Sequence, residues 1–159
     1  MDQTTVAWLA GLIGGEGTIS IVSGARRVKG VRRPQYRVVC KVYNSNRSLM
    51  DALVERTSAG RINGPYSYGD GARRPMYQWF MNTQEMTVWL PELLPWLVIK
   101  KRQAELALAA IEVKASALPT PGVQCVRNPQ NDEALDALRI EIQALNQSGG
   151  LSAGTLQVP

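Results

Sequence analysis

Residues Trp8–Gly17 read WLAGLIGGEG, and the alternating stretch TISIV follows at once at positions 18–22. Thr4 or Thr5 can cap a helix that runs through the apolar residues to Ile13. Small residues at Ala7, at Gly11 and in the Gly14–Gly15 pair leave one face of this helix nearly bare. A glycine inside a helix costs about 1 kcal/mol relative to alanine. This cost indicates that a second backbone comes close to the bare face.

The carboxylate of Glu16 lies at the end of the expected helix. Gly15 and Gly17 flank it and allow the chain to leave the helix sharply. The helix dipole disfavours an anion at this end, so Glu16 is suited to a cation, either a basic side chain or a metal ion. The alternative is a buried helix with a glycine cap and a solvated glutamate.

Length and composition argue against several classes of protein, namely membrane-spanning, secreted, zinc-binding and disulfide-rich proteins. A chain of 159 residues can form one domain with a hydrophobic core. There is no uninterrupted apolar run of about 18 residues and no basic segment before the first apolar run, so we expect an intracellular protein without a membrane span or signal peptide. Two cysteines and no histidine argue against a zinc site, a disulfide scaffold and a histidine base. Hydrolysis by this chain would have to use carboxylates, lysine, water and metal.

The basic residues are concentrated in one part of the chain. No Asp or Glu occurs between Glu16 and Asp51, and the interval holds Arg26, Arg27, Lys29, Arg32, Arg33, Arg37, Lys41 and Arg47. A concentrated basic face on a protein of net charge +5 is typical of nucleic-acid binding. The alternative is a solvated, arginine-rich hairpin.

Two hairpins are expected. The first has strands at 18–23 and 35–43 with a loop at 24–34, and its second strand alternates between Tyr36, Val38, Cys40 and Val42, which suit a core, and Gln35, Arg37, Val39 and Lys41. On this second face, Gln and Arg side chains can form hydrogen bonds with base edges, and Lys can contact phosphates. Thr18, Ser20 and Val22 of the first strand would lie on the same face. The second hairpin has strands at 61–68 and 74–82. Its candidate DNA-binding residues are Arg61, Asn63, Tyr66, Tyr68, Arg73, Arg74 and Gln78.

Helices are expected at 47–57, at 84–90 with an interruption at Pro91, and up to about Lys114. We divide the chain into a core domain at 1–114, a linker at 115–131, a C-terminal helix at 132–147 and a flexible tail at 148–159. The C-terminal helix carries its apolar residues at helical spacing, namely Leu135, Leu138, Ile142 and Leu145. Two roles stay open for it, which are to stabilise the core or to touch DNA.

The stretch Leu9–Gly17 resembles the LAGLIDADG motif of homing endonucleases. Glu16 stands at the metal-binding position, and Gly14 replaces an acid usual in the family. The segment PWLVIKKRQA at 95–104 resembles a second family segment, in which Lys100 matches a lysine near the scissile phosphate. The resemblance covers roughly 6–114 and includes one copy of the motif. It implies an α+β fold of αββαββα order, in which four antiparallel strands form a saddle with helices on one face.

The resemblance also implies a site and a reaction. Glu16 and the backbone carbonyl of Gly15 would bind Mg²⁺, Lys100 would stabilise charge on the phosphate, and Asn44 would help to place the attacking water. A single-motif chain would act as a homodimer that makes a double-strand break in a long, pseudo-palindromic site in double-stranded DNA. The interface would consist of Ala7, Trp8, Gly11, Leu12, Gly14 and Gly15.

Two other functions remain open at this stage. One is a catalytically inactive nucleic-acid-binding protein of the same fold, such as an RNA-splicing maturase or a transcriptional regulator. The other is a basic α+β structural or ribosome-associated protein, which would be a stable monomer and would not need a glycine-faced helix.

Overall fold

The computed structural model describes residues 1–28, 30–67, 74–116 and 129–148, with the side chains at 28 and 31–33 outside the description. In these ranges the chain forms an α+β fold in which the strands belong to one antiparallel sheet. The elements are α1 Gln3–Glu16, β1 Gly17–Val28, β2 Val31–Asn44, α2 Arg47–Thr57, β3 Arg61–Tyr66, β4 Met76–Met81, α3 Thr83–Leu93, the 3-10 helix η1 Leu94–Trp96, α4 Lys101–Ser116 and α5 Pro129–Gln147.

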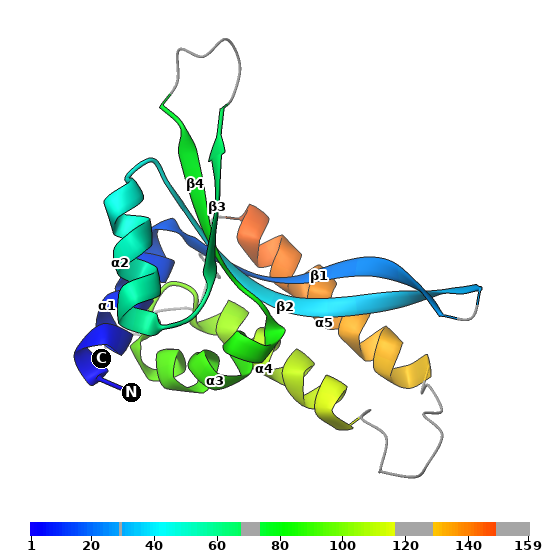
Figure 1. Ribbon diagram of the computed structural model, residues 1–159. Coiled ribbons are helices and arrows are strands. Elements are labelled where there is room, and N and C mark those ends of the chain that lie inside the picture. The colour runs from blue at the N-terminus through cyan, green and yellow to red at the C-terminus, as the bar shows by residue number, and fades with distance from the viewer. Residues whose placement is uncertain (29, 68–73, 117–128, 149–159) are drawn as a thin grey trace, which may run out of the picture.

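The sheet has the strand order β1-β2-β4-β3 and is strongly twisted. The β1–β2 hairpin and the β3–β4 hairpin extend from a common centre in different directions (Figure 1). One face of the sheet is packed against helices and contributes its alternate residues to the core, among them Ile19, Val38, Cys40 and Trp79. This confirms the expected αββαββα order, the four-stranded antiparallel sheet and the core set of the second strand.

The first helix begins earlier than the sequence predicted. The side chain of Asp2 caps it by accepting hydrogen bonds from the backbone N–H groups of Thr4 and Thr5, at 3.4 and 2.9 Å. The prediction that a threonine caps the helix was therefore wrong, because an aspartate carboxylate one turn upstream meets the same need.

The expected loop at 24–34 was also wrong. β1 and β2 stay paired to the tip, and their register continues through Gly24↔Gln35 and Ala25↔Pro34 to Val28↔Val31. β2 pairs with β4 only over residues 40–44. Pro34 therefore lies in a part of β2 that has β1 as its one neighbour, and a proline, which lacks a backbone N–H, is tolerated at such an edge. The described side chains of this ribbon, at 24–27 and 34, are exposed. An exposed strand need not alternate between apolar and polar residues, so hydrophobic alternation could not predict it.

Pro91 does not interrupt its helix as predicted, since α3 continues through it to Leu93. The helix is well started, because Asn82 and Glu85 form a capping box at its N-terminus. Pro91 lies in the last turn, where the loss of one helical hydrogen bond is tolerated. η1 follows directly and leads the chain towards α4.

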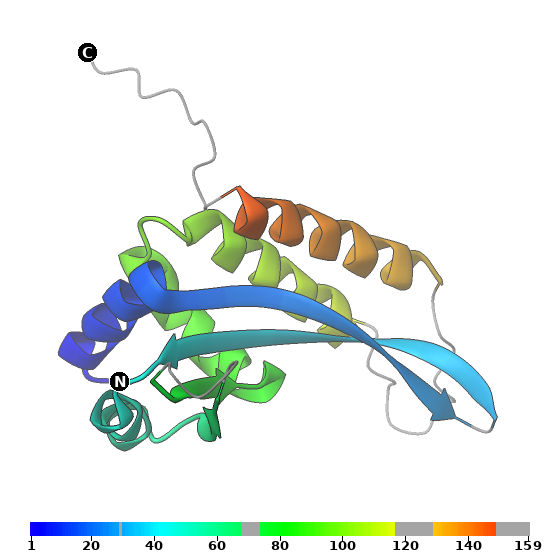
Figure 2. The ribbon, with the colours of Figure 1, turned by 90° about the horizontal axis from the view of Figure 1, so that it is seen from above.

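Helix α5 lies beside α4 and beside the edge strand β1 (Figure 2). It buries Leu135 and Ile142 in the same hydrophobic core as the sheet and the other helices. The side chain of Asn146 donates to the carbonyl of Ile19 on the sheet edge at 2.9 Å. The sequence left two roles open for this helix, and its packing shows that it stabilises the core.

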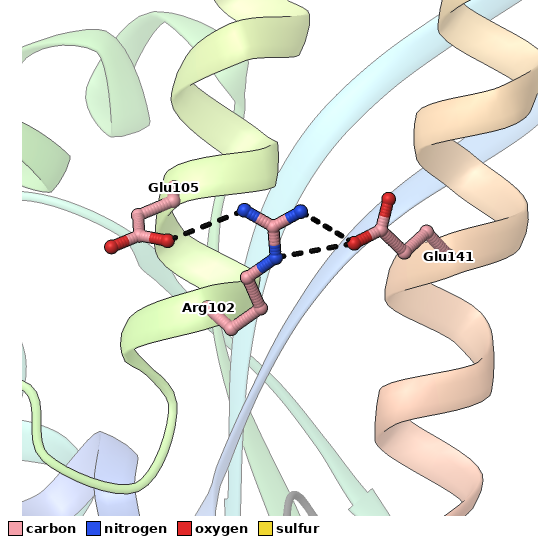
Figure 3. Close-up of polar contacts among 3 residues, drawn as sticks. All are labelled: Arg102, Glu105 and Glu141. Carbon is pink, nitrogen blue, oxygen red and sulfur yellow. Dashed lines mark hydrogen bonds and ion pairs between the residues drawn. The ribbon is translucent and has the colours of Figure 1, made fainter. Parts of the chain in front are cut away.

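A charged contact also ties α5 to α4. The Arg102 guanidinium lies between Glu105 on its own helix and Glu141 on α5, at 3.4 and 2.7 Å (Figure 3). All these side chains are about half exposed, so the contact orients the two helices and adds little to stability. None of the helices in the described ranges combines the length and apolar character needed to cross a bilayer.

Candidate active site and nucleic-acid surface

Glu16 is the last residue of α1, and its side chain is exposed. The chain passes directly from this residue into β1 through Gly17. A Cβ atom on Gly17 would lie 2.7 Å from the Cα and 2.8 Å from the carbonyl oxygen of Ile13. Glycine is therefore required at position 17 for a close approach of backbone atoms, and this approach places Glu16 at the junction of helix and sheet.

Asn44 contacts Glu16 from the end of β2, although the two residues are 28 positions apart. The Asn44 Nδ2 atom donates a hydrogen bond to Glu16 Oε2, and Asn44 Oδ1 accepts one from the backbone N–H of Asn46 at 2.8 Å. A backbone N–H can only donate, so this second bond orients the amide and directs its NH₂ group to the carboxylate. Asn44 is thus a fixed donor to Glu16.

Lys100 reaches the same end of α1 from the residue preceding α4. Its Nζ atom donates to the carbonyl of Gly14 at 3.1 Å. Carbonyls in the last turn of a helix lack intrahelical partners, and a cation is favoured beside them. Partial burial lowers the pKa of Lys100 from its ordinary value. The structure therefore brings the three predicted catalytic residues to the last turn of α1 and its junction with the sheet.

Cys40 lies near Lys100 but belongs to the core. Burial raises the pKa of its thiol to about 12, although the charge of Lys100 acts in the opposite direction. The thiol is therefore protonated at neutral pH and is suited neither to nucleophilic attack nor to metal binding.

The oxygen atoms at this end of α1 could serve as ligands of a hard divalent cation. They are the Glu16 carboxylate and the carbonyls of the last helical turn, and Mg²⁺ and Ca²⁺ prefer such oxygen ligands. Within the described ranges, no group of three or more His, Cys, Asp or Glu side chains could hold a metal ion. One chain therefore offers part of a cation site, and the other ligands would have to come from water, a phosphate or a second molecule.

The predicted interface glycines lie on an open face of α1. Cβ atoms added at Gly11, Gly14 or Gly15 would meet nothing within 4 Å. The opposite face is buried through Val6, Leu9, Ala10 and Ile13. Ala7, Trp8 and Leu12 are half-buried at the margins, and the Arg56 guanidinium lies 5.1 Å from the centre of the Trp8 ring. That this face binds a second copy stays a prediction.

The face of the sheet that turns away from the helices carries two neighbouring rows of side chains. The strand register places Tyr43, Gln78 and Asn63 opposite one another in the first row, and Lys41, Phe80 and Arg61 in the second. The polar members of both rows were predicted from the sequence, whereas Tyr43 and Phe80 were not. Continuing the alternation by two residues, from Lys41 to Tyr43 and from Gln78 to Phe80, would have found them.

The remaining candidate DNA-binding residues are spread along both hairpins. Arg26, Arg27, Gln35 and Arg37 are exposed on the β1–β2 ribbon, Ser20 and Val22 are partly buried near its base, and Tyr66 and Arg74 are exposed on the second hairpin. Lys29, Tyr68 and Arg73, with the side chains of Arg32 and Arg33, lie outside the described residues. Arg47 forms an ion pair with Asp51 on α2, at 2.9 Å.

A twisted four-stranded sheet that carries helices on one face and starts from a glycine-rich helix defines a known architecture. No protein-family model matches the chain, and no curated protein does. Solved structures do match. The homing endonuclease I-CvuI, in complex with the I-CreI target, has a TM-score of 0.71 and 21% identity over 99% of this chain and 87% of that one.

Two further structures agree with this result. The archaeal intron-encoded homing endonuclease I-Vdi141I, complexed with DNA, has a TM-score of 0.66 and 15% identity, and covers 100% of this chain and 91% of that one. The LAGLIDADG homing endonuclease I-SmaMI, bound to cleaved DNA, has a TM-score of 0.59 and 19% identity, and the match covers 95% of this chain but 45% of that one. The chain therefore has the fold of the LAGLIDADG homing endonucleases.

Proposed function

We propose that this protein is a sequence-specific DNA endonuclease that makes a metal-dependent double-strand break as a homodimer. The observation that carries the proposal is the arrangement at the end of α1, where Asn44 donates to the Glu16 carboxylate and Lys100 donates to a carbonyl of the last helical turn. A broad sheet face with rows of polar and basic side chains lies next to this site. Structural neighbours of the chain have been crystallised with DNA, which supports a DNA partner.

The homodimer follows from the number of carboxylates. One chain contributes a single Glu16, whereas cleavage of both DNA strands requires a site for each strand. The open glycine face of α1 allows the helices of two copies to pack closely, through the same residues in both chains. Such packing would bring two Glu16 carboxylates together, and their repulsion would be relieved by bound cations.

The chemistry divides among residues of this chain. Glu16 and the carbonyl of Gly15 would hold Mg²⁺, which when bound lowers the pKa of a water ligand and stabilises the leaving oxygen. Asn44 keeps the Glu16 carboxylate in one orientation through its donated hydrogen bond. Lys100 supplies a positive charge that can stabilise the phosphate in the transition state.

DNA binding would use the outer sheet face and the long ribbon. The exposed arginines of the β1–β2 ribbon suit phosphates, and the rows at the centre of the sheet suit base edges. Each phosphate contact should change the slope of log K against log salt by about −0.9. Binding should therefore weaken steeply as salt is raised.

The test compares the wild-type protein with Glu16→Gln on a library of random double-stranded DNA, with Mg²⁺ or with EDTA. We expect the wild type to cut a long, roughly two-fold site only with Mg²⁺, and the variant to cut it more than about a hundredfold more slowly while still binding. Glu112→Gln, on an exposed part of α4, is the matched control and should cut normally. Equal cutting by wild type and Glu16→Gln would refute the assignment of the site. Selective binding without any cutting would instead indicate the inactive binding protein.

A further inference from the structure

The row formed by Tyr43, Gln78 and Asn63 is connected by hydrogen bonds across three strands. Asn63 Nδ2 donates to Gln78 Oε1 at 3.1 Å, and Gln78 Nε2 donates to the hydroxyl oxygen of Tyr43. The register places both contacts between directly opposed residues, Tyr43↔Gln78 and Asn63↔Gln78. Gln78 is therefore the central member, and each polar atom of its amide makes one hydrogen bond within the row.

The two ends of the row present different groups to a partner. Because the Tyr43 oxygen accepts from Gln78, its own hydrogen is available as a donor. Asn63 uses its NH₂ group on Gln78, so its Oδ1 atom is available as an acceptor. Within the described residues, neither of these groups takes part in another hydrogen bond. Tyr43 is 37% exposed, so its hydroxyl can be reached from outside.

The same row has a second self-consistent arrangement. A half-turn of both amides would let the Tyr43 hydroxyl donate to Gln78 Oε1, and Gln78 Nε2 donate to Asn63 Oδ1. The Tyr43 end would then offer an acceptor and the Asn63 end a donor. A reversal at one end requires a reversal at the other, because an oxygen facing an oxygen, or an NH₂ facing an NH₂, would break the chain of hydrogen bonds.

We propose that Gln78 is a relay that couples the base preferences of Tyr43 and Asn63, and does not read a base itself. The inference rests on the proposed DNA-binding function. In the major groove, guanine and thymine present a carbonyl oxygen and adenine and cytosine present an amino group. One arrangement of the row prefers a carbonyl base at the Tyr43 end and an amino base at the Asn63 end, and the other arrangement prefers the opposite pair. The two positions of the target should therefore vary together.

The neighbouring row shows why this coupling is particular to Gln78. Phe80 occupies the corresponding central position between Lys41 and Arg61, and the Arg61 guanidinium lies 4.8 Å from the centre of its ring. A phenyl ring can orient Arg61 but cannot transmit a hydrogen-bond polarity to Lys41. Base preferences at Lys41 and Arg61 should therefore be independent of each other.

The experiment selects bound sites from a random duplex library, with the wild-type protein and Ca²⁺, and sequences them. Sites are selected in parallel with the Tyr43→Phe and Asn63→Ala variants. The target position at which each variant loses its base preference is the position contacted by that end of the row. We expect pairs of one carbonyl base and one amino base to exceed like pairs by about tenfold in the wild-type pool. Gln78→Met, which keeps the length of the side chain without its amide, should abolish the excess in the sites that it selects.

Tyr77→Phe is the matched control for Tyr43→Phe and should preserve the covariation, since Tyr77 packs against the hydrophobic core and lies outside the row. Circular dichroism of each variant establishes that it is folded. Selective binding in which the two positions vary independently, or in which Gln78→Met keeps the excess, would overturn the relay alone. A wild-type protein that selects no sequence would overturn the proposed function and the relay with it.

Discussion

Replacement of Gly11 by alanine should have opposite effects on the stability of the single chain and on the affinity of a dimer. Gly11 lies inside α1 on its exposed face, and an added Cβ atom would meet nothing within 4 Å. In the isolated chain, alanine should therefore raise the free energy of unfolding by up to about 1 kcal/mol through helix propensity alone.

The same methyl group should weaken a dimer. If two α1 helices pack through their glycine faces, the two-fold axis places an added methyl from each chain in the contact. Overpacking costs about 1–3 kcal/mol for each crowded group, so two groups should weaken association by about 2–6 kcal/mol, or about thirtyfold or more in Kd. Gly11→Leu should have a larger effect for the same reason.

Sedimentation velocity over a range of concentrations gives the dimer Kd, and urea unfolding at concentrations below that Kd gives the stability of the monomer. Gly17→Ala is the contrasting variant, because its Cβ would lie 2.7 Å from the Ile13 Cα and should destabilise the monomer itself. Gly11→Ala protein that dimerises like the wild type, or that is less stable as a monomer, would refute the reasoning. So would a wild-type protein that stays monomeric at micromolar concentration.

Two further predictions concern α5 and α4. Ile142→Ala should lower the free energy of unfolding by about 2–5 kcal/mol in urea titrations, because Ile142 is 1% exposed and lies in the core. Ile140→Ala is the control and should change the free energy of unfolding little, because Ile140 is 55% exposed. Equal effects of the two substitutions would contradict the core role of α5. Burial, with a smaller effect of the Arg37 charge, lowers the pKa of Lys114 below its ordinary 10.5, so the folded state loses this proton before the unfolded state does. The wild type should therefore gain stability relative to Lys114→Met as the pH rises through the folded pKa towards 10.5. Urea titrations at successive pH values measure this difference, with Lys101→Met, on the exposed side of α4, as the control; a constant difference would show that Lys114 is not desolvated.

Much of the fold could be predicted because its signals are local. The run from Leu9 to Gly17 specifies a helix, a sharp exit and the start of a strand within a few residues, and alternation identified the core residues of β2. The order of helices and strands followed from such patterns. The position of Glu16 at the end of the first helix pointed to a cation site, whereas Lys100 and Asn44 were selected only by the resemblance to the family.

Other features depended on which elements pack together. The described side chains of the ribbon, at 24–27 and 34, are exposed. Helix α3 continues through Pro91 because its capping box and its packing outweigh one missing hydrogen bond. The core role of α5 became visible only when Leu135 and Ile142 were found against the sheet. Hydrophobic periodicity cannot report such contacts, because it describes one segment at a time.

The sequence by itself therefore determined the elements, their order and the residue types available for chemistry. Tertiary structure decided that Asn44 donates to Glu16, that Lys100 binds the carbonyl of Gly14, and that Tyr43, Gln78 and Asn63 form one row. The physical reason is that each of these contacts joins residues far apart in the chain. Their distances are set by strand register and helix packing, which arise from the whole core and not from any single stretch.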